Sequence, residues 1–433
     1  MTPTRRGFVT ALGPLTLAPF VGWSGRGAAP SVDGPRLLER FHGLARFGAT
    51  PEGGISRVAF SDADLAARAY LTDWMRAAGL DVHVDVAGNL VGRRPGREDL
   101  APICLGSHID SVPEGGNFDG QVGSAAAVEV AHTLLDSGVR LRHPLEVLIF
   151  PNEEGGKTGS RALAGEVGAE EMTLPTASGF TIGEGLARIG GDPARLAEAA
   201  RGPDSVAAFF ELHIEQGGVL DRRGIPIGVV EGIVGIRRWR VTVEGHQNHA
   251  GTTPMPDRTD AMVLAARVVV AIDDVLRARP GTHVGTVGQI EAFPGAANVI
   301  AGRVVHTLEI RDLRMETIDA LFADVRARAE AIADGAGGRV SFEPYYVSYA
   351  APTEERLRRH VEASAEALGL ETLRLPSGAG HDAQSMARLG PIGMIFVPSV
   401  DGISHSPDEL TRDPHIVQGA NVLLGTVLAA DAD

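Results

Sequence analysis

Short apolar runs alternate with helical stretches in the first half of the sequence. Residues 103–105 and 147–150 are two such runs, and residues 124–137, which show helical apolar spacing, lie between them. Strands that alternate with helices usually form a mostly parallel sheet whose two faces are covered by helices. Such sheets bind ligands at the carboxyl ends of their strands. The sequence therefore predicts an α/β fold with a site at one edge of a mixed, mostly parallel sheet.

The pattern changes after residue 230. From there the apolar spacing predicts strands and helices in the order β-α-β-β-α-β, which is the order of a ferredoxin-like module. We therefore expect residues 231–347 to form an inserted α+β domain. Residues 31–230 and 348–433 would be the two parts of the α/β domain that the insertion interrupts.

The charge and cysteine content limit the possible partners and crosslinks. The formal net charge is −15, so the chain would repel the phosphate backbone of a nucleic acid, and no nucleic acid partner is expected. Cys104 is the single cysteine, so no disulfide can form within the chain.

The first 30 residues differ from the rest of the chain. Arg5 and Arg6 form a twin-arginine pair, and the mildly apolar residues 11–21 follow it. That stretch is too short, and too interrupted by proline and glycine, to span a bilayer as a stable helix. Residues 1–30 resemble a Tat export signal, which a receptor reads and which does not anchor the protein. We therefore expect an exported, periplasmic protein without a stable membrane anchor.

Residues that can bind metal follow the predicted strands. His108 lies just after the run 103–105, and Asp110 could accept the hydrogen bond of its second ring nitrogen. Asp119 lies in a glycine-rich turn, where its two carboxylate oxygens could bridge two cations. Taken alone, His108 could be a surface histidine and Asp119 an ordinary turn residue.

An acidic pair follows the second run. Glu153 and Glu154 are adjacent like charges, which are costly to hold together unless a cation compensates them or one takes a proton. One could bind metal while the other transfers protons, and an exposed acidic loop is the alternative. His213 and His405 lie beside further apolar segments. Three histidines, one aspartate and one glutamate at strand ends together predict a metal site.

These motifs resemble those of one family of metallohydrolases. The strings that carry the resemblance are Gly106-Ser107-His108-Ile109-Asp110-Ser111, Phe118-Asp119-Gly120, Asn152-Glu153-Glu154-Gly155, residues 211–217, His249-Ala250-Gly251-Thr252-Thr253-Pro254-Met255, Asn298-Val299-Ile300, Gly380-His381-Asp382-Ala383 and His405-Ser406-Pro407. They are similar to the hydantoinase/carbamoylase branch of the dinuclear zinc aminoacylase and carboxypeptidase superfamily. That branch includes N-carbamoyl-L-amino-acid hydrolases, allantoate amidohydrolases and ureidoglycolate amidohydrolases. The resemblance covers residues 35–430.

The resemblance implies roles for individual residues. The metal ligands would be His108, Asp119, Glu154, His213 and His405, with Asp119 shared by two ions. Glu153 would be the general base, and Asp110 would accept a hydrogen bond from the second ring nitrogen of His108 and so fix its orientation. His249 would donate to the developing oxyanion, across a dimer interface. The residues on the substrate side would be Gln216, Asn298, Arg311 and His381. Arg311 would bind the substrate carboxylate through its two-donor fork.

The resemblance also implies a reaction. A water held between two divalent metal ions would attack the C–N bond of a small carbamoyl or ureido carboxylate, with Glu153 as the general base. Zinc is the ion expected from the histidine-rich ligand set, and manganese, cobalt or nickel would also fit it. The inserted domain would act as a lid and join two copies of the chain into a homodimer.

One segment departs from the family pattern. Residues 156–160 form a shorter stretch than relatives carry after the acidic pair, and they contain no aromatic side chain, which leaves the pocket shape and the substrate open. The main alternative function is an aminoacylase or dipeptidase that cleaves an amide. A periplasmic binding protein without catalysis is a remote alternative, since Glu153 and all five expected ligands are present.

Overall fold

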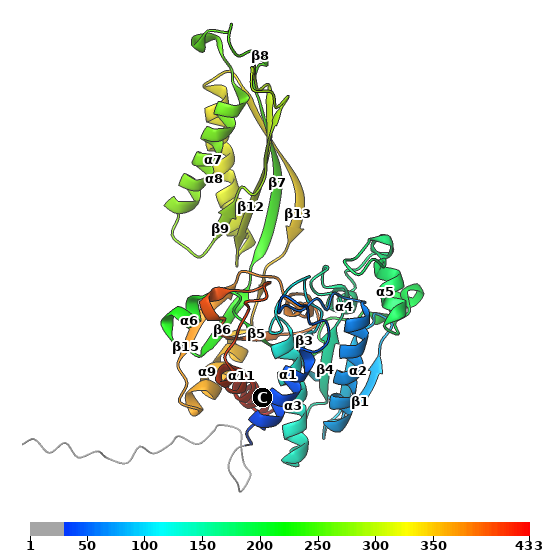
Figure 1. Cartoon of the computed structure of the whole chain (residues 1–433). Helices are drawn as coiled ribbons and strands as arrows, with labels where there is room; N and C mark the ends of the chain where they lie inside the picture. Colours follow the sequence, from blue (N-terminus) through cyan, green and yellow to red (C-terminus); the bar gives the residue numbers. More distant parts are fainter. Residues whose placement is uncertain (1–29) are drawn as a thin grey trace, which may run out of the picture.

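The computed structural model describes residues 30–433. Two sheets organise these residues, and Figure 1 shows the smaller one standing as an extension above the larger. The chain leaves the larger sheet after residue 233, builds the smaller sheet, and returns at residue 351. Residues 1–29, which hold almost all of the predicted export signal, lie outside the described residues.

The larger sheet has nine strands and a parallel centre. Its order is β1-β2-β4-β3-β5-β16-β6-β14, and β15 pairs with β6. The four central strands, β4, β3, β5 and β16, all run parallel to one another. The strands β1, β2 and β14 toward the edges form antiparallel pairs. The strands are β1 (Asp81–Val84), β2 (Leu90–Arg94), β3 (Ile103–His108), β4 (Leu145–Phe150), β5 (Ala208–Ile214), β6 (Ile227–Ile233), β14 (Ala351–Pro352), β15 (Thr372–Ser377) and β16 (Ile392–Val397). The predicted mixed α/β fold is confirmed.

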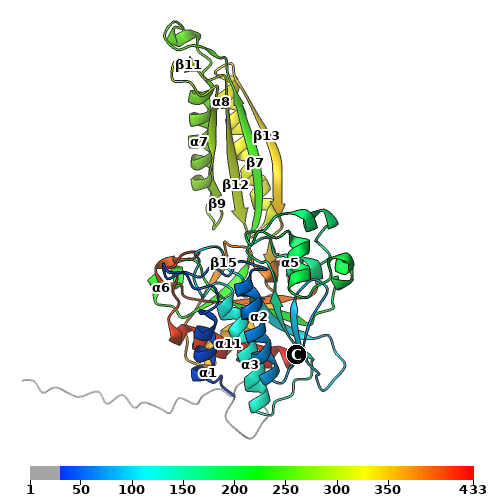
Figure 2. The same cartoon turned by 45° about the vertical axis from the view of Figure 1, so that its right-hand side comes forward.

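Side chains alternate between two cores on the two faces of this sheet. Along β4, Val147 and Ile149 pack into one core, and Leu148 and Phe150 pack into the other. This period of two is what a strand buried on both faces requires. Figure 2 shows α1, α2, α3 and α11 together over one face. The helices with residues in that core are α1 (Gly34–Leu44), α2 (Asp62–Ala77), α3 (Gln121–Asp136), α9 (Glu355–Ala367) and α11 (Asp413–Asp431).

Shorter helices cover the other face. They are α4 (Thr158–Leu163), α5 (Ile182–Arg188), α6 (Val219–Arg223) and α10 (Asp382–Met386), with the 3-10 helices η1 (Ala169–Thr173) and η2 (Pro193–Ala199). Cys104 is buried in this second core. No helix within residues 30–433 has the length and apolar character needed to cross a membrane.

The smaller sheet is antiparallel, in the order β10-β12-β7-β13, with β9 also paired to β12. Two helices cover one of its faces, and Trp239 of β7 stacks on Phe322 with 4.1 Å between ring centroids. The elements are β7 (Gly235–Glu244), α7 (Ala261–Ala278), β9 (Val284–Thr286), β10 (Ile290–Phe293), β12 (Arg303–Asp312), α8 (Met315–Asp334) and β13 (Arg339–Ser348). A two-stranded sheet of β8 (Asn248–His249) and β11 (Val299–Ile300) lies at the far end of the extension (Figure 1), near η3 (Met255–Asp257).

One predicted strand is wrong in detail. Spacing predicts a single strand over residues 285–290, but the structure divides it into β9 and β10. The hydroxyl of Thr307 accepts the backbone N–H groups of Gly288 and Gln289, each at 3.2 Å. A side-chain oxygen therefore takes the place of a backbone acceptor here, while the Thr307 N–H still donates to the Gln289 carbonyl at 3.1 Å, and apolar spacing carries no signal for that exchange.

Candidate metal centre

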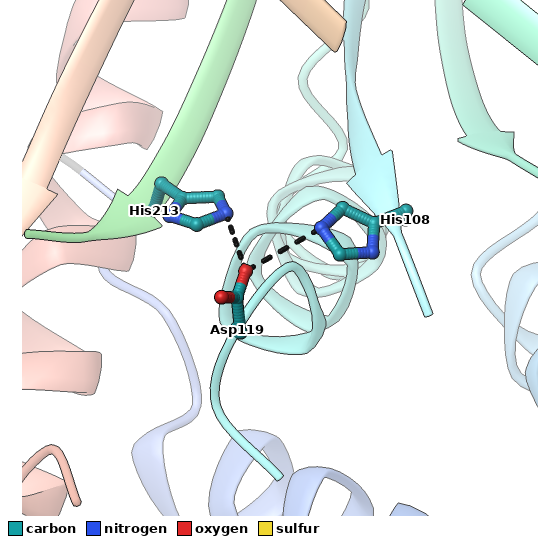
Figure 3. Close-up of side chains that lie close together, drawn as sticks. All are labelled: His108, Asp119 and His213. Carbon is teal, nitrogen blue, oxygen red and sulfur yellow. Dashed lines mark ion pairs between the residues drawn. The ribbon is translucent and has the colours of Figure 1, made fainter. Parts of the chain in front are cut away.

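Asp119 lies at the centre of a cluster of imidazole and carboxylate groups. Its Oδ1 atom is 3.1 Å from His213 Nε2 and 3.5 Å from His108 Nε2, as Figure 3 shows. Its Oδ2 atom lies 3.2 Å from His405 Nε2. One oxygen of this carboxylate therefore faces two imidazoles, and the other faces a third.

The sheet and one tight turn position these side chains. His108 ends β3, and His213 is the penultimate residue of the adjacent parallel strand β5, so both reach the same edge. Gly120 follows Asp119 with φ 71°, and a β-carbon there would lie 2.3 Å from His108 Nε2. Only glycine fits both that backbone conformation and that space.

The acidic pair reaches the same cluster from β4. Glu154 Oε2 lies 3.6 Å from His405 Nε2, on the Oδ2 side of Asp119. Glu153 Oε2 lies 3.9 Å from His108 Nε2, on the Oδ1 side. All five residues expected to bind metal, and the expected base, are thus brought together, while their individual roles stay predictions.

The donor atoms of this cluster suit divalent metal ions. His108 Nδ1 lies 2.9 Å from the Asp110 carbonyl, and His213 Nδ1 lies 2.9 Å from the Ile214 carbonyl. A carbonyl can only accept, so each Nδ1 carries its proton, and in the neutral ring each Nε2 has a lone pair that a cation beside Asp119 could accept. The buried Oε1 atom of Glu154 has no hydrogen-bond partner within the described part of the chain. Ring nitrogens that face a carboxylate and an unpaired carboxylate oxygen are features that a cation would satisfy, although His213 Nε2 also accepts the backbone N–H of Gly120 at 3.2 Å.

Without a cation, the cluster carries uncompensated charge. Burial raises the pKa of both Glu153 and Glu154 to about 8, and the Lys157 ammonium lowers the pKa of Glu153 in part. The hydrogen bond to Asp119 raises the pKa of His405 to about 9. Protons would therefore occupy these groups at neutral pH unless metal ions replaced them.

Two residues expected on the substrate side lie beside one cavity. Gln216 donates to Asp119 Oδ2 at 2.6 Å, so its amide contacts the shared carboxylate. Gln216 and Arg311 line a cavity of about 740 Å³. Arg311 donates from Nε to Glu309 at 2.6 Å and from a terminal nitrogen to the Gly378 carbonyl at 2.7 Å. Arg311 thus belongs to β12 of the smaller sheet and reaches a loop of the larger one.

The other substrate-side residues are divided between the cluster and the far end of the extension. His381 is buried against His213, with ring centroids 4.4 Å apart, and its Nε2 contacts Ser377 Oγ at 2.7 Å. His249 belongs to β8, and the Asn298 carbonyl accepts the backbone N–H of Ala250 at 3.1 Å. Figure 1 places β8 at the end of the extension that is remote from the larger sheet. Within this one chain, the structure does not bring His249 and Asn298 to the cluster.

Glu409 is a residue of the site that sequence reasoning missed. One carboxylate oxygen accepts the backbone N–H groups of Phe118 and Asp119 at 3.0 and 3.1 Å. The other accepts Ser404 Oγ at 2.9 Å and the backbone N–H of His405 at 3.2 Å. Glu409 therefore ties two expected ligands together across 286 residues of sequence. Its only signal was an acid shortly after His405, which is too common to interpret.

Glu211 has a similar supporting position. Its two carboxylate oxygens accept Ser107 Oγ at 2.7 Å and the backbone N–H of Ala383 at 2.9 Å. These bonds join β3, β5 and α10 directly behind His108 and His213. The string 211–217 is distinctive because it contains His213. Nothing in its spacing indicates that Glu211 bridges two other elements.

Comparisons with known proteins identify the family. Residues 104–429 match the model of peptidase family M20/M25/M40. The chain is 42% identical to an N-carbamoyl-L-amino acid amidohydrolase of Geobacillus stearothermophilus, over 92% of this chain and 98% of the relative. It is 33% identical to a ureidoglycolate hydrolase of Arabidopsis thaliana, over 93% and 88%.

A solved structure agrees with this assignment. An amidase of the hydantoinase/carbamoylase family from Burkholderia multivorans is 38% identical and aligns with a TM-score of 0.84, over 93% of this chain and 99% of that one. The resemblance inferred from the motifs is confirmed. The chain belongs to peptidase family M20/M25/M40 and, within it, to the hydantoinase/carbamoylase amidases, metal-dependent hydrolases of carbon–nitrogen bonds other than peptide bonds.

Proposed function

We propose that this protein hydrolyses the C–N bond of a small carbamoyl or ureido carboxylate of the N-carbamoyl-L-amino acid, allantoate or ureidoglycolate type. One observation carries the proposal: one oxygen of Asp119 faces the imidazoles of His108 and His213, the other faces that of His405, and the acidic pair lies beside them. An arrangement of this kind can hold two cations on either side of one carboxylate. Relatives with 33–42% identity carry the names of enzymes for such substrates.

Two divalent ions per chain fit the donors. His108 and His213 with Asp119 would hold one ion, and Glu154 and His405 with Asp119 would hold the other. Zinc suits this mixture of nitrogen and oxygen donors, and manganese, cobalt or nickel are alternatives. Bound ions of this kind polarise a carbonyl and make a water acidic near neutral pH.

Glu153 is the residue placed to move protons. Its carboxylate is nine-tenths buried at the edge of the cluster, and it lies on the His108 side without belonging to either group of expected ligands. Glu153 would accept a proton from the attacking water and return it to the leaving nitrogen. Hydrolysis of a carbamoyl group in this way converts the substrate and one water into a free amine, CO2 and ammonia.

Arg311 is the residue placed to bind the substrate carboxylate. It lines the cavity next to Gln216, which itself contacts Asp119, so an anion at Arg311 lies on the same side as the cluster. A guanidinium presents two parallel donors to a carboxylate. Its present partners, Glu309 and the Gly378 carbonyl, keep the side chain extended toward that cavity.

The smaller sheet would serve as a lid and as the site of homodimer formation. Val263 and Val270, two helical turns apart on α7, are 46% and 61% exposed, so this face of the helix is open to a second copy. His249 lies at the remote end of the same extension, where it could enter the site of a partner. The homodimer would then complete each site with a residue from the other chain.

Export by the Tat route and a periplasmic location remain part of the proposal. They rest on the twin arginines Arg5 and Arg6 at the start of the sequence. Fusion of residues 1–30 to a reporter that matures before export would test them. Loss of periplasmic reporter after replacing both arginines with lysine is expected, and unchanged export would contradict the assignment.

The proposed reaction is tested with the metal-loaded protein by measuring ammonia release from carbamoyl and ureido substrates and free amino acid release from the controls. The substrates to compare are N-carbamoyl-L-amino acids, N-carbamoyl-β-alanine, allantoate and ureidoglycolate, with N-acetyl-L-amino acids and dipeptides as controls. We expect release from at least one carbamoyl or ureido carboxylate and little hydrolysis of the controls. Faster cleavage of the acetyl compounds would point to an aminoacylase instead.

A further inference from the structure

Lys157 is the only lysine among the 40 basic residues of the chain. It belongs to the short segment 156–160, where the sequence departs from the family pattern. Its backbone has φ 57° and ψ 40°, the left-handed conformation that favours glycine, yet the long side chain is present. Such conformations in residues other than glycine gather at functional positions.

Lys157 belongs to the turn that carries the proposed base, where burial raises the pKa of the Glu153 carboxyl and the Lys157 ammonium lowers it in part. The backbone N–H of Lys157 donates to the Glu153 carbonyl at 2.9 Å, so it closes the turn that carries Glu153. A β-carbon added at Gly380 would lie 3.3 Å from Nζ. The loop 378–380 therefore has Lys157 at one end and Arg311, bonded to the Gly378 carbonyl, at the other. Two cations flank one short loop beside the metal centre.

Lys157 also lines a cavity of about 710 Å³ between the two sheets. Three cations and one acid contribute to its walls: Lys157, Arg161, Arg388 and Glu166. Arg161 pairs with Glu171 at 2.7 Å, and Arg388 pairs with Glu166 at 3.0 Å. The walls of the cavity at Arg311 contain three arginines and two glutamates, so both cavities have an excess of positive charge.

The hydrogen-bond partner of the Lys157 ammonium is a neutral amide, and the nearby Glu153 carboxyl feels the ammonium only through its charge. Within residues 30–433, the side chain that hydrogen-bonds it is the Gln384 amide, through Oε1. Gln384 is itself fixed, because its Nε2 donates to the Tyr349 carbonyl at 2.7 Å and to Ser348 Oγ at 3.0 Å. An ammonium has three donors, so Lys157 keeps capacity for an anion that enters the cavity.

We propose that Lys157 is a specificity-determining residue that binds a second carboxylate of the substrate. The preferred substrates are then N-carbamoyl-L-amino acids with an acidic side chain. This inference rests on the proposed function, in which Arg311 binds the first carboxylate. The substrate would lie along the loop 378–380, with one carboxylate at Arg311 and the other at Lys157.

Substrates that differ only in charge test the inference. N-carbamoyl-L-glutamate and N-carbamoyl-L-aspartate are compared with the glutamine and asparagine analogues, which have nearly the same shape. We expect kcat/KM to favour the acids in the wild type, and Lys157→Met to lower the acid-to-amide ratio by about 10- to 100-fold. Lys157→Arg keeps a cation and should retain part of the ratio. Both replacements are unbranched at the β-carbon, as lysine is, so the backbone conformation is equally accessible.

The double variant Glu166→Gln, Arg388→Met is the matched control. It removes an ion pair from the wall of the same cavity and leaves the net charge unchanged, so the ratio should stay unchanged. An equal loss of kcat/KM for acids and amides in Lys157→Met would show that Lys157 merely tethers Gln384, and it would overturn the proposal. So would a wild type without preference for the acids.

A binding measurement separates this inference from the proposed reaction. Because the chain has one lysine, an amine-acylating reagent modifies Lys157 and the N-terminus alone, and mass spectrometry reads each site. In the metal-loaded Glu153→Gln variant, N-carbamoyl-L-glutamate should slow acylation of Lys157, and N-carbamoyl-L-glutamine should not. If N-carbamoyl-L-glutamate protects Lys157 but the wild type hydrolyses none of the substrates, the proposed reaction is wrong and the binding role of Lys157 stands. Hydrolysis without selective protection would reject the role of Lys157.

Discussion

The carboxylate of Asp110 accepts a hydrogen bond from the backbone N–H of Glu153 at 3.3 Å. Its other oxygen accepts the backbone N–H of Glu154 at 3.2 Å. His108 Nδ1 lies 3.8 Å from the first oxygen and 2.9 Å from the Asp110 carbonyl. One buried residue therefore holds the proposed base and two proposed ligands in a single arrangement, whereas the sequence indicated only support for His108.

Asp110→Asn should weaken metal binding without unfolding the protein. The amide keeps one acceptor oxygen but turns an NH2 group toward a backbone N–H, so one side of the acidic turn is released. We expect metal affinity to fall by about 10- to 100-fold, measured by competition with a chromogenic chelator. Asp312→Asn is the control, because Asp312 also accepts a backbone N–H, at 2.9 Å, but on the smaller sheet. Equal affinity of the Asp110 variant and the wild type would contradict the role given to Asp110.

Glu153 and Glu154 should respond differently to the same change. Glu153→Gln keeps size and polarity but cannot accept a proton, so turnover should fall by roughly 10²–10⁴ or more while metal content is retained. Glu154→Gln removes a charged donor from the group with Asp119 and His405, so it should lower metal content. Metal analysis and steady-state kinetics on both variants check this. Metal loss in Glu153→Gln with full occupancy in Glu154→Gln would mean that the two roles are exchanged.

Arg311→Ala should lower kcat/KM, because one partner of a charge pair with the substrate is lost. The corresponding activation free energy should rise by about 2–5 kcal/mol. Arg311→Lys should recover only part, since an ammonium lacks the two-donor fork. Arg237→Ala is a suitable control: Arg237 lies on the adjacent strand β7 and pairs with Asp319 at 2.6 Å. Near-normal kcat/KM in Arg311→Ala would remove the proposed carboxylate site.

A mixture of two inactive variants tests the homodimer. Glu153→Gln should inactivate the site of its own chain, and His249→Ala should inactivate the site of the partner. After subunit exchange, half of the dimers contain both variants and have one intact site of two, so activity should rise to about a quarter of the wild-type value. Activity that stays at the level of the separate variants, with mixed dimers shown by mass spectrometry, would exclude a contribution of His249 from the partner.

Val270→Glu should shift the protein toward the monomer, because it places a charge on the exposed apolar face of α7. Sedimentation velocity at micromolar concentration is the measurement. Asp274→Ala, one helical turn further along, is the control. A Val270→Glu dimer of wild-type stability would show that this face of α7 is not the interface.

Much of the fold could be predicted because the periodicity of apolar residues, and the residues that begin and end helices, are visible within short stretches of sequence. β3, β4 and β16 are uniformly buried strands that stand out as apolar runs, and α2 begins at residue 62, where Ser61 caps it. The expected ligands were found because each lies in a specific string at a strand end. The long C-terminal helix α11 was missed, since its buried residues surround the helix and leave no amphipathic period to detect.

The supporting contacts of the site could not be predicted for a different reason. Glu409 and Glu211 act through hydrogen bonds to residues more than 100 positions away, and single glutamates carry no local signal of that. The position of Lys157 likewise depends on how the short segment 156–160 folds against Gln384. Local patterns predict elements and motifs, whereas these contacts arise only when the sheet brings distant segments together.

The central claim is that Asp119 serves two metal ions at once, and metal analysis of Asp119→Ala tests it most directly. The wild type and the variant would be loaded with zinc, passed through a desalting column, and analysed by inductively coupled plasma mass spectrometry. Circular dichroism would confirm that both are folded. The account predicts two ions per chain in the wild type and neither ion firmly held in the variant. Two ions retained per chain in Asp119→Ala would contradict it.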